Sequence, residues 1–157
     1  MRKDLIIDGI IFGKATIGGN DATQNIIDMY NNLKRNDIGF ILLDGMIISM
    51  FNIVDGEAIY NNTGIPLIII TFKNSQGLDN TIKKHFPNSY DTRITLIKKL
   101  GKRETILLKT NKFLLIRIWG IKLNDAVSLL NSFLIQGSIP EPIKLAKIIS
   151  RAYLKTL

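Results

Sequence analysis

Asp44 is the residue whose type and position most directly suggest chemistry. It follows an apolar run, residues 38–43, that is typical of a buried strand, so its carboxylate is expected at the carboxyl end of that strand. Ligands of open α/β sheets bind at this edge, and Gly45 would let a backbone or a phosphate approach closely. The alternative is that Asp44-Gly45 forms a simple turn. We predict Asp44 as a metal ligand and catalytic residue, with Gly45 at the edge of the site.

Asp21 is the second candidate metal ligand. It precedes a helical pattern, and Gln24 follows three residues later, which is the spacing of a capping box. Capping alone explains this residue, although a second carboxylate oxygen would remain for a metal ion. Two-metal hydrolysis of a phosphodiester usually requires more acidic ligands than these two carboxylates supply.

Three further polar residues are expected near the same edge. Lys73 follows a predicted strand over 66–72; its ammonium would neutralise charge on a reacting phosphate, or its stem would simply lie along the surface. Asn52 belongs to segment 51–55, which we expect to fold over the strand ends. Its amide would bind a base edge or a phosphate, or would bridge backbone groups of the loop. Asp55 ends that segment and is predicted at the edge of the site.

The whole chain has a formal net charge of +8, and its basic residues concentrate in the second half. Residues 1–72 carry 8 acidic and 5 basic side chains, whereas residues 73–122 carry 3 acidic and 12 basic ones. A metal-binding acidic part beside a basic part suits a protein that acts on a polyanion such as DNA, and a solvated basic surface is the equal alternative. The residues predicted to contact nucleic acid are Asn52, Lys98, Lys99, Lys102 and Arg103.

The residue types that are missing narrow the chemistry. The sequence has no cysteine and a single histidine, His85, which excludes disulfides, thiolate metal sites and any site with two imidazoles. A bound metal is therefore expected to be a hard ion, Mg²⁺ or Mn²⁺, on carboxylate oxygens. No apolar run approaches the roughly 20 residues that span a bilayer, and the start does not resemble a signal peptide. We expect a cytoplasmic protein without a membrane partner.

The elements that must position these residues alternate between helix and strand. The pattern predicts one or two strands within 5–17, a helix over 21–35, a strand over 38–43, a helix over 55–62 stopped by Gly64, a strand over 66–72, a helix over 75–86, strands over 93–100, 104–109 and 112–119, a helix from Asn124 to about 136, and a last helix from Pro140. Together these elements predict an α/β sandwich with a mixed central sheet.

Five short motifs in a fixed order resemble the archaeal endonuclease dU family, which is similar to endonuclease V. They are Asp8-Gly9 with residues 11–14, then residues 19–23, 42–45 with 51–55, 63–66 and 140–146. The resemblance covers essentially the whole chain and implies a ribonuclease H-like, endonuclease V-like three-layer sandwich. It also implies a Mg²⁺-dependent endonuclease that acts on deaminated-base, deoxyuridine-type DNA in repair. By this resemblance, Asp44 and Asp21 hold the metal, Lys73 lies at the site edge, and Glu141 opens the last helix, whose first turns face the site.

The sequence departs from the family pattern at three places. Gly18-Gly19 stands where the family has Asp-Gly, no histidine is present near Lys147, and Met1 resembles an internal point that follows the family's first strand and its aspartate. We therefore expect a single domain over 1–157, shortened relative to the family, with weak or no cleavage. A missing strand would leave a sheet edge exposed, which favours a homodimer. The alternatives are a non-catalytic nucleic-acid-binding protein of the same fold and an assembly or metabolite-binding protein.

Overall fold

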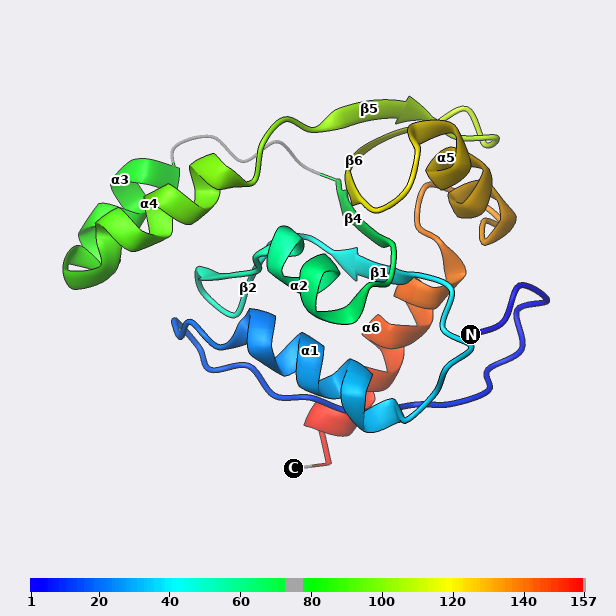
Figure 1. Cartoon of the computed structure of the whole chain (residues 1–157), viewed down its shortest axis with the longest axis horizontal. Coiled ribbons are helices and arrows are strands. Elements are labelled where there is room, and N and C mark those ends of the chain that lie inside the picture. Colours follow the sequence, from blue (N-terminus) through cyan, green and yellow to red (C-terminus); the bar gives the residue numbers. More distant parts are fainter. Residues whose placement is uncertain (73–77, 157) are drawn as a thin grey trace.

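A mixed four-stranded sheet lies at the centre of the molecule, with helices around it (Figure 1). The computed structural model describes residues 1–72 and 78–156, and within them no helix is long and apolar enough to cross a membrane. The elements in chain order are α1 (Ala22–Leu33), β1 (Ile41–Asp44), β2 (Ile47–Ile48), β3 (Asn52–Ile53), α2 (Gly56–Thr63), β4 (Leu67–Thr71), α3 (Leu78–His85), a 3₁₀ turn (Pro87–Ser89), α4 (Tyr90–Lys99), β5 (Glu104–Leu107), β6 (Phe113–Trp119), α5 (Leu123–Ser132) and α6 (Glu141–Leu154).

Strand β4 is the most deeply buried part of the sheet. Its residues Leu67, Ile68, Ile69 and Ile70 are at most 1% exposed, as a continuously apolar strand covered on both faces should be. It pairs in parallel with β1 and antiparallel with β6, and β6 pairs antiparallel with β5, which gives the order β1-β4-β6-β5. The mixed sheet predicted from sequence is confirmed. Among the described strands, β1 has no neighbour on its other edge, while β2 and β3 form a separate ribbon.

The strand register assigns side chains to the two faces of the sheet. Residues paired across neighbouring strands point to the same face, and successive residues alternate. Leu43, Ile69 and Arg117 form one row across β1, β4 and β6, and Asp44 begins the next row with Ile70. The Leu43 row faces the core built with α1 and α2, whereas the Asp44 row faces the core built with α5 and α6. Asp44 and Arg117 therefore lie on opposite faces.

Residues 5–17 form no strand, contrary to the sequence prediction. They run as an extended trace past α1 (Figure 1, blue) and are anchored there by Arg35, which lies beyond the end of that helix. Its guanidinium donates to the Asp8 carboxylate at 2.7 Å and to Asp37 at 2.6 Å. The prediction is wrong because strand-forming residue types supply only a preference, and in the structure this segment forms no backbone pairing with a strand.

Residues 93–99 belong to helix α4 and Leu100 is its C-cap, so the strand predicted over 93–100 is also wrong. Arg93, Leu96, Ile97 and Leu100 recur at helical spacing; Arg93 and Leu100 are buried, and the two residues between them pack against the core of the α1 and α2 side. Packing of this inward stripe overrides the local preference of the segment's β-branched residues for a strand.

The other predicted elements agree with the structure within a few residues. Helix α2 ends at Gly64, which adopts the left-handed φ of 67° that glycine tolerates without strain. The turn at Thr110-Asn111 joins β5 to β6 as a hairpin, and α6 begins directly after Pro140. Helix α5 begins at Leu123, so Asn124 lies inside this helix and does not cap it.

A buried guanidinium joins α4 to two loops on the α1 side of the sheet. The Arg93 side chain, 3% exposed, donates to the carbonyl oxygens of Gly18 at 2.6 Å, of Gly19 at 3.2 Å and of Phe51. Its charge also lies 4.2 Å from the ring centre of Phe86. Burial of the charge lowers the pKa of Arg93, and hydrogen bonds from a charged donor offset that desolvation.

We expect Arg93→Met to lower the free energy of unfolding by about 3 kcal/mol, because three buried carbonyl oxygens lose a charged donor. Chemical denaturation followed by circular dichroism measures the loss. Lys98→Met removes an exposed charge from the same helix and should change stability by less than about 0.5 kcal/mol. Equal effects of the two substitutions would contradict this role of Arg93.

Candidate functional site

Asp44 ends β1 and forms an ion pair with α6. The Lys147 ammonium lies 2.5 Å from its Oδ2, and the two side chains are 35% and 32% exposed for Lys147 and Asp44 respectively. Lys147 also lies over the ring of Phe72, 5.3 Å from its centre. Gly45 follows with a φ of 81°, and a Cβ there would meet only open space. The carboxyl end of β1 thus carries a partly exposed carboxylate beside an accessible backbone.

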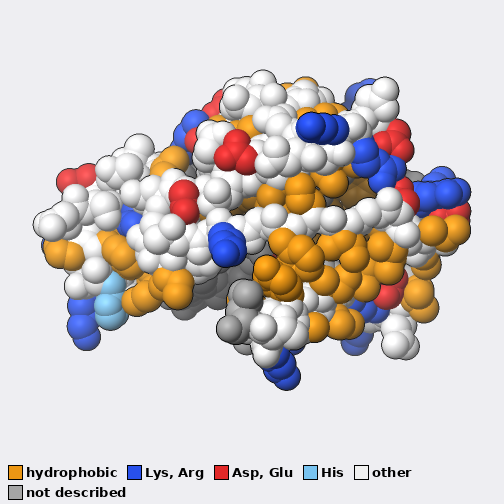
Figure 2. Space-filling model, turned by 90° about the horizontal axis from the view of Figure 1, so that it is seen from below, with side chains coloured by type: hydrophobic (Ala, Val, Ile, Leu, Met, Phe, Trp, Pro, Cys, Tyr) orange, Lys and Arg blue, Asp and Glu red, His pale blue; other side chains and the backbone are white. Residues whose placement is uncertain are grey.

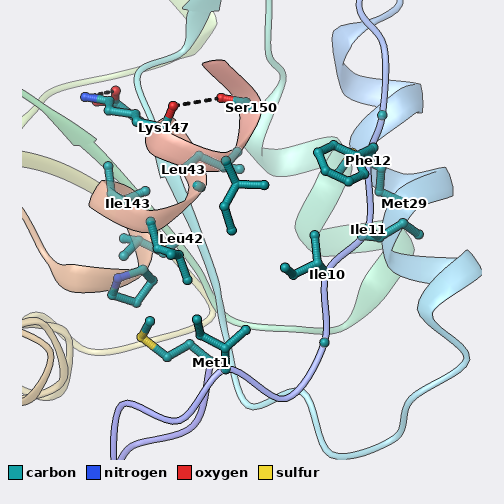
Figure 3. Close-up of a pocket in the computed structure, with 18 residues that line it drawn as sticks. Met1, Ile10, Ile11, Phe12, Met29, Leu42, Leu43, Ile143, Lys147 and Ser150 are labelled. Carbon is teal, nitrogen blue, oxygen red and sulfur yellow. Dashed lines mark hydrogen bonds and ion pairs between the residues drawn. The ribbon is translucent and has the colours of Figure 1, made fainter. Parts of the chain in front are cut away.

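An apolar groove runs from this ion pair along the free edge of β1. It has a volume of about 480 Å³ and lies between β1 with α6 on one side and residues 7–13 on the other (Figure 3). Asp44 and Lys147 are the charged side chains among its lining residues, and Pro142 and Ile143 bring the first turn of α6 to its wall. The groove is therefore apolar along most of its lining, with the ion pair of Asp44 and Lys147 as its charged part.

A broad apolar surface is visible on the side of the molecule that carries the N-terminal segment (Figure 2). Within this segment Ile6, Ile7, Ile10 and Phe12 are each about half exposed. Phe12 stacks on Tyr153 of α6, with ring centres 4.5 Å apart. The segment is thus held against α6 by an aromatic contact without being part of the sheet.

Asp21 does not join Asp44. It stands at the N-cap position of α1 but makes no capping hydrogen bond with its side chain. Its carboxylate instead accepts from the Thr16 hydroxyl at 2.7 Å and from the Asn52 amide at 2.5 Å. These donors, Thr16 first and Asn52 second, lower the pKa of Asp21 to about 2. The predicted capping box is wrong, because the carboxylate turns toward the preceding loop.

Asn52 and Asp55 act within the protein. Asn52 is completely buried, and its Oδ1 accepts from the first backbone amide of α1, Ala22, at 3.0 Å. It therefore supplies the cap that Asp21 does not, and burial rules out a direct contact with nucleic acid, so that prediction is corrected. Asp55 caps α2 by accepting from the Ala58 amide at 3.0 Å and pairs with Lys99 at 2.9 Å.

The basic residues predicted to contact nucleic acid differ in their surroundings. Lys99 is neutralised by Asp55 and by Glu57, each at 2.9 Å. Lys98 is exposed on the last turn of α4. Lys102 and Arg103 line hollows beside β6 together with Arg117, a residue that the sequence analysis did not select. The sequence could have pointed to Arg117, because this charged residue interrupts the otherwise apolar run of β6.

Glu141 and Lys73 are the two remaining candidates. Glu141 forms an ion pair with Lys144 at 2.5 Å on the first turn of α6. Lys73 lies outside the described residues. Within the parts of the chain that the structure describes, no three acidic or histidine side chains form a group that would hold a metal ion. Asp44 therefore offers a single carboxylate, which fits one ligand of a hard cation and does not make a centre for two metal ions.

The fold and this edge define a mixed α/β domain with a carboxylate at the carboxyl end of a parallel strand pair. The model of the endonuclease dU family matches residues 1–154, and the chain belongs to this family. It is 36% identical to a UPF0215 protein of Pyrobaculum aerophilum, over 99% of this chain and 85% of that protein. It is 34% identical to a UPF0215 protein of Nanoarchaeum equitans, over 99% and 77% of the two chains.

A solved structure shares the architecture. The crystal structure of a protein of unknown function from Archaeoglobus fulgidus superposes with a TM-score of 0.75 at 26% identity, covering 87% of this chain and 77% of that one. The arrangement of strands and helices is therefore one that this relative also adopts.

The lowered pKa of Asp21 makes stability depend on pH. Its native pKa of about 2 lies below the ordinary value of 3.8, so its contribution is complete above pH 3.8 and is lost as the pH falls toward 2. We expect Asp21→Asn to be less stable than the wild type at neutral pH, with the difference shrinking between about pH 4 and pH 2. Thermal unfolding across this range measures it. Arg35 also lowers the pKa of Asp8 to about 2. Asp8 titrates in both the wild type and Asp21→Asn, so its effect cancels in the difference between their stabilities. A constant difference would contradict the assignment.

Proposed function

We propose that this protein is a divalent-cation-dependent endonuclease of ribonuclease H-like fold that acts on deaminated-base, deoxyuridine-type DNA. The observation that carries the proposal is the position of Asp44 at the carboxyl end of β1, partly exposed, in a chain that belongs to the endonuclease dU family. Ligands of open α/β sheets bind at this edge. The basic side chains of α4 and of the β5 and β6 hairpin support a polyanionic substrate.

Asp44 is the residue that we assign as the ligand of Mg²⁺ or Mn²⁺. Mg²⁺ commonly binds through one or two carboxylates and completes its shell with water and substrate phosphate, which fits the single carboxylate here. Such an ion, when bound, activates water and neutralises charge on the phosphate. Gly45 contributes an open backbone position beside it, where a phosphate has room to approach.

Lys147 limits this activity in our proposal. Its ammonium lies 2.5 Å from Oδ2 of Asp44, so a cation must compete with the ion pair for this oxygen. Asp21 is engaged by Thr16 and Asn52 and supplies no second ligand beside Asp44. We therefore expect slow cleavage.

A non-catalytic nucleic-acid-binding protein is the second candidate, and the same ion pair favours it. If Lys147 replaces the metal ion on Asp44 permanently, the basic surface would bind DNA without cutting it.

The homodimer expected from an exposed sheet edge stays a prediction.

We expect slow, Mg²⁺- or Mn²⁺-dependent nicking of a duplex that contains deoxyuridine, and a loss of at least tenfold in Asp44→Asn because a metal ligand is removed. Gel analysis of an end-labelled duplex under enzyme excess measures it. Asp125→Asn, an exposed carboxylate on α5, is the matched control and should cut like the wild type.

Two outcomes would contradict the endonuclease. Equal nicking by wild type and Asp44→Asn would place the chemistry elsewhere or in a contaminant. Metal-independent DNA binding with no incision by the wild type would instead identify the non-catalytic protein.

A further inference from the structure

Two arginines lie close together where β5 begins and β6 ends: Arg103 directly precedes β5, and Arg117 belongs to β6. The register pairs Glu104 with Ile116, so one step further places Arg103 opposite Arg117. Like charges at directly opposite positions of an antiparallel pair destabilise a sheet. The electrostatic effect is present here, because the charge of Arg103, together with burial, lowers the pKa of Arg117. A pair of this kind is stabilised when an anion lies between the two guanidinium groups.

The Arg117 guanidinium is held in one orientation. Its Nε and Nη2 donate to the carbonyl oxygen of Gly101 at 3.2 Å and 3.1 Å. Among the described residues it forms no ion pair with a carboxylate. A guanidinium has five N–H donors, so the hydrogen bonds to Gly101 leave donors for a ligand.

Both arginines line a cleft at the carboxyl ends of the parallel strands. Its volume is about 410 Å³, and its other walls include Gly45 after β1, Thr71 at the end of β4 and Leu100 after α4. No acidic side chain is among the described residues that line this cleft. A second hollow shares both arginines with it and is also lined by Lys102, and its described lining residues include no acidic side chain.

Among the described residues, carboxylates line the neighbouring hollow that Arg117 shares with α2. Asp55 and Glu57 line it and are paired with Lys99, and Glu104 lies on its wall. Glu104 belongs to the row of Ile116, on the face of the sheet opposite to Arg117. The two carboxylates on the α2 side of Arg117 are therefore already engaged by Lys99.

We propose that Arg103 and Arg117 bind a phosphate group in this cleft, on the face of the sheet opposite to Asp44. The planar fork of a guanidinium matches a phosphate in bidentate fashion, and two such forks side by side bind one phosphate with their mutual repulsion removed. Naming a nucleic-acid backbone as the source of that phosphate rests on the proposed function. Gly45 lines the same cleft, so a strand bound there passes directly beside Asp44 at the end of β1.

The test is DNA binding without metal. Fluorescence anisotropy of a labelled oligonucleotide in EDTA, over a range of salt concentrations, should show that Arg117→Met weakens binding about tenfold and reduces the salt slope by about one. Arg151→Met removes an exposed arginine from α6, outside the cleft, and should change affinity less than twofold. Arg103→Met is the second variant and should behave like Arg117→Met, with circular dichroism confirming that both are folded.

A titration with inorganic phosphate separates the two sources of the ligand. Chemical-shift changes at the Arg117 Nε signal, saturating with phosphate and absent in Arg103→Met, would support the phosphate site itself. Equal weakening of DNA binding by Arg117→Met and Arg151→Met would overturn the cleft as a nucleic-acid site. If inorganic phosphate still bound at Arg117 in that case, the cleft would be assigned to a small phosphorylated ligand. Because the binding assay contains no metal, it does not depend on cleavage; Arg117-dependent binding together with no nicking in the separate Mg²⁺ assay would refute only the endonuclease.

Discussion

The parallel pairing of β1 with β4 is the constraint on which the other features depend. This register points Leu43 into the core of α1 and α2, so that Asp44, one residue later, must face α6. The pairing of β4 with β6 then places Arg117 in the row of Leu43. The sheet therefore separates an acidic position from a basic one, and Gly45, which follows Asp44, lines the cleft of Arg117 at the carboxyl ends of β1 and β4.

Two buried polar side chains, Asn52 and Arg93, hold the loops on the α1 side beside its apolar core. Ser49, Met50 and Phe51 have left-handed φ values of 39°, 57° and 64°, which non-glycine residues seldom adopt. Asn52 and Arg93 stabilise this turn, because Asn52 joins it to the start of α1 and Arg93 binds the Phe51 carbonyl. Strained backbone of this kind persists only where surrounding contacts determine it.

The sequence predicted the elements whose signal is local and failed where a tertiary partner decides. The apolar run of β4 and the glycine that ends α2 are properties of their own segments. The roles of Asn52 and Arg93 depend on loops 30 or more residues away, which spacing along the chain does not reveal. Asp21 is held both by Thr16, which is near in sequence, and by the distant Asn52. The position of Asp44 at the end of a strand was predicted from the apolar run that precedes it. Its ion-pair partner Lys147 belongs to the last helix, and the sequence gives no indication of that contact.

We propose that nucleic acid lies across the carboxyl ends of β1 and β4 and reaches both faces of the sheet. Hydrogen exchange measured by mass spectrometry, with and without a bound DNA duplex, tests this arrangement. We expect slower exchange on DNA binding at the amides of Gly45 and Met46 and at those of residues 101–103, with no change in α5. Protection confined to α5, or to the apolar surface of residues 6–12, would contradict it.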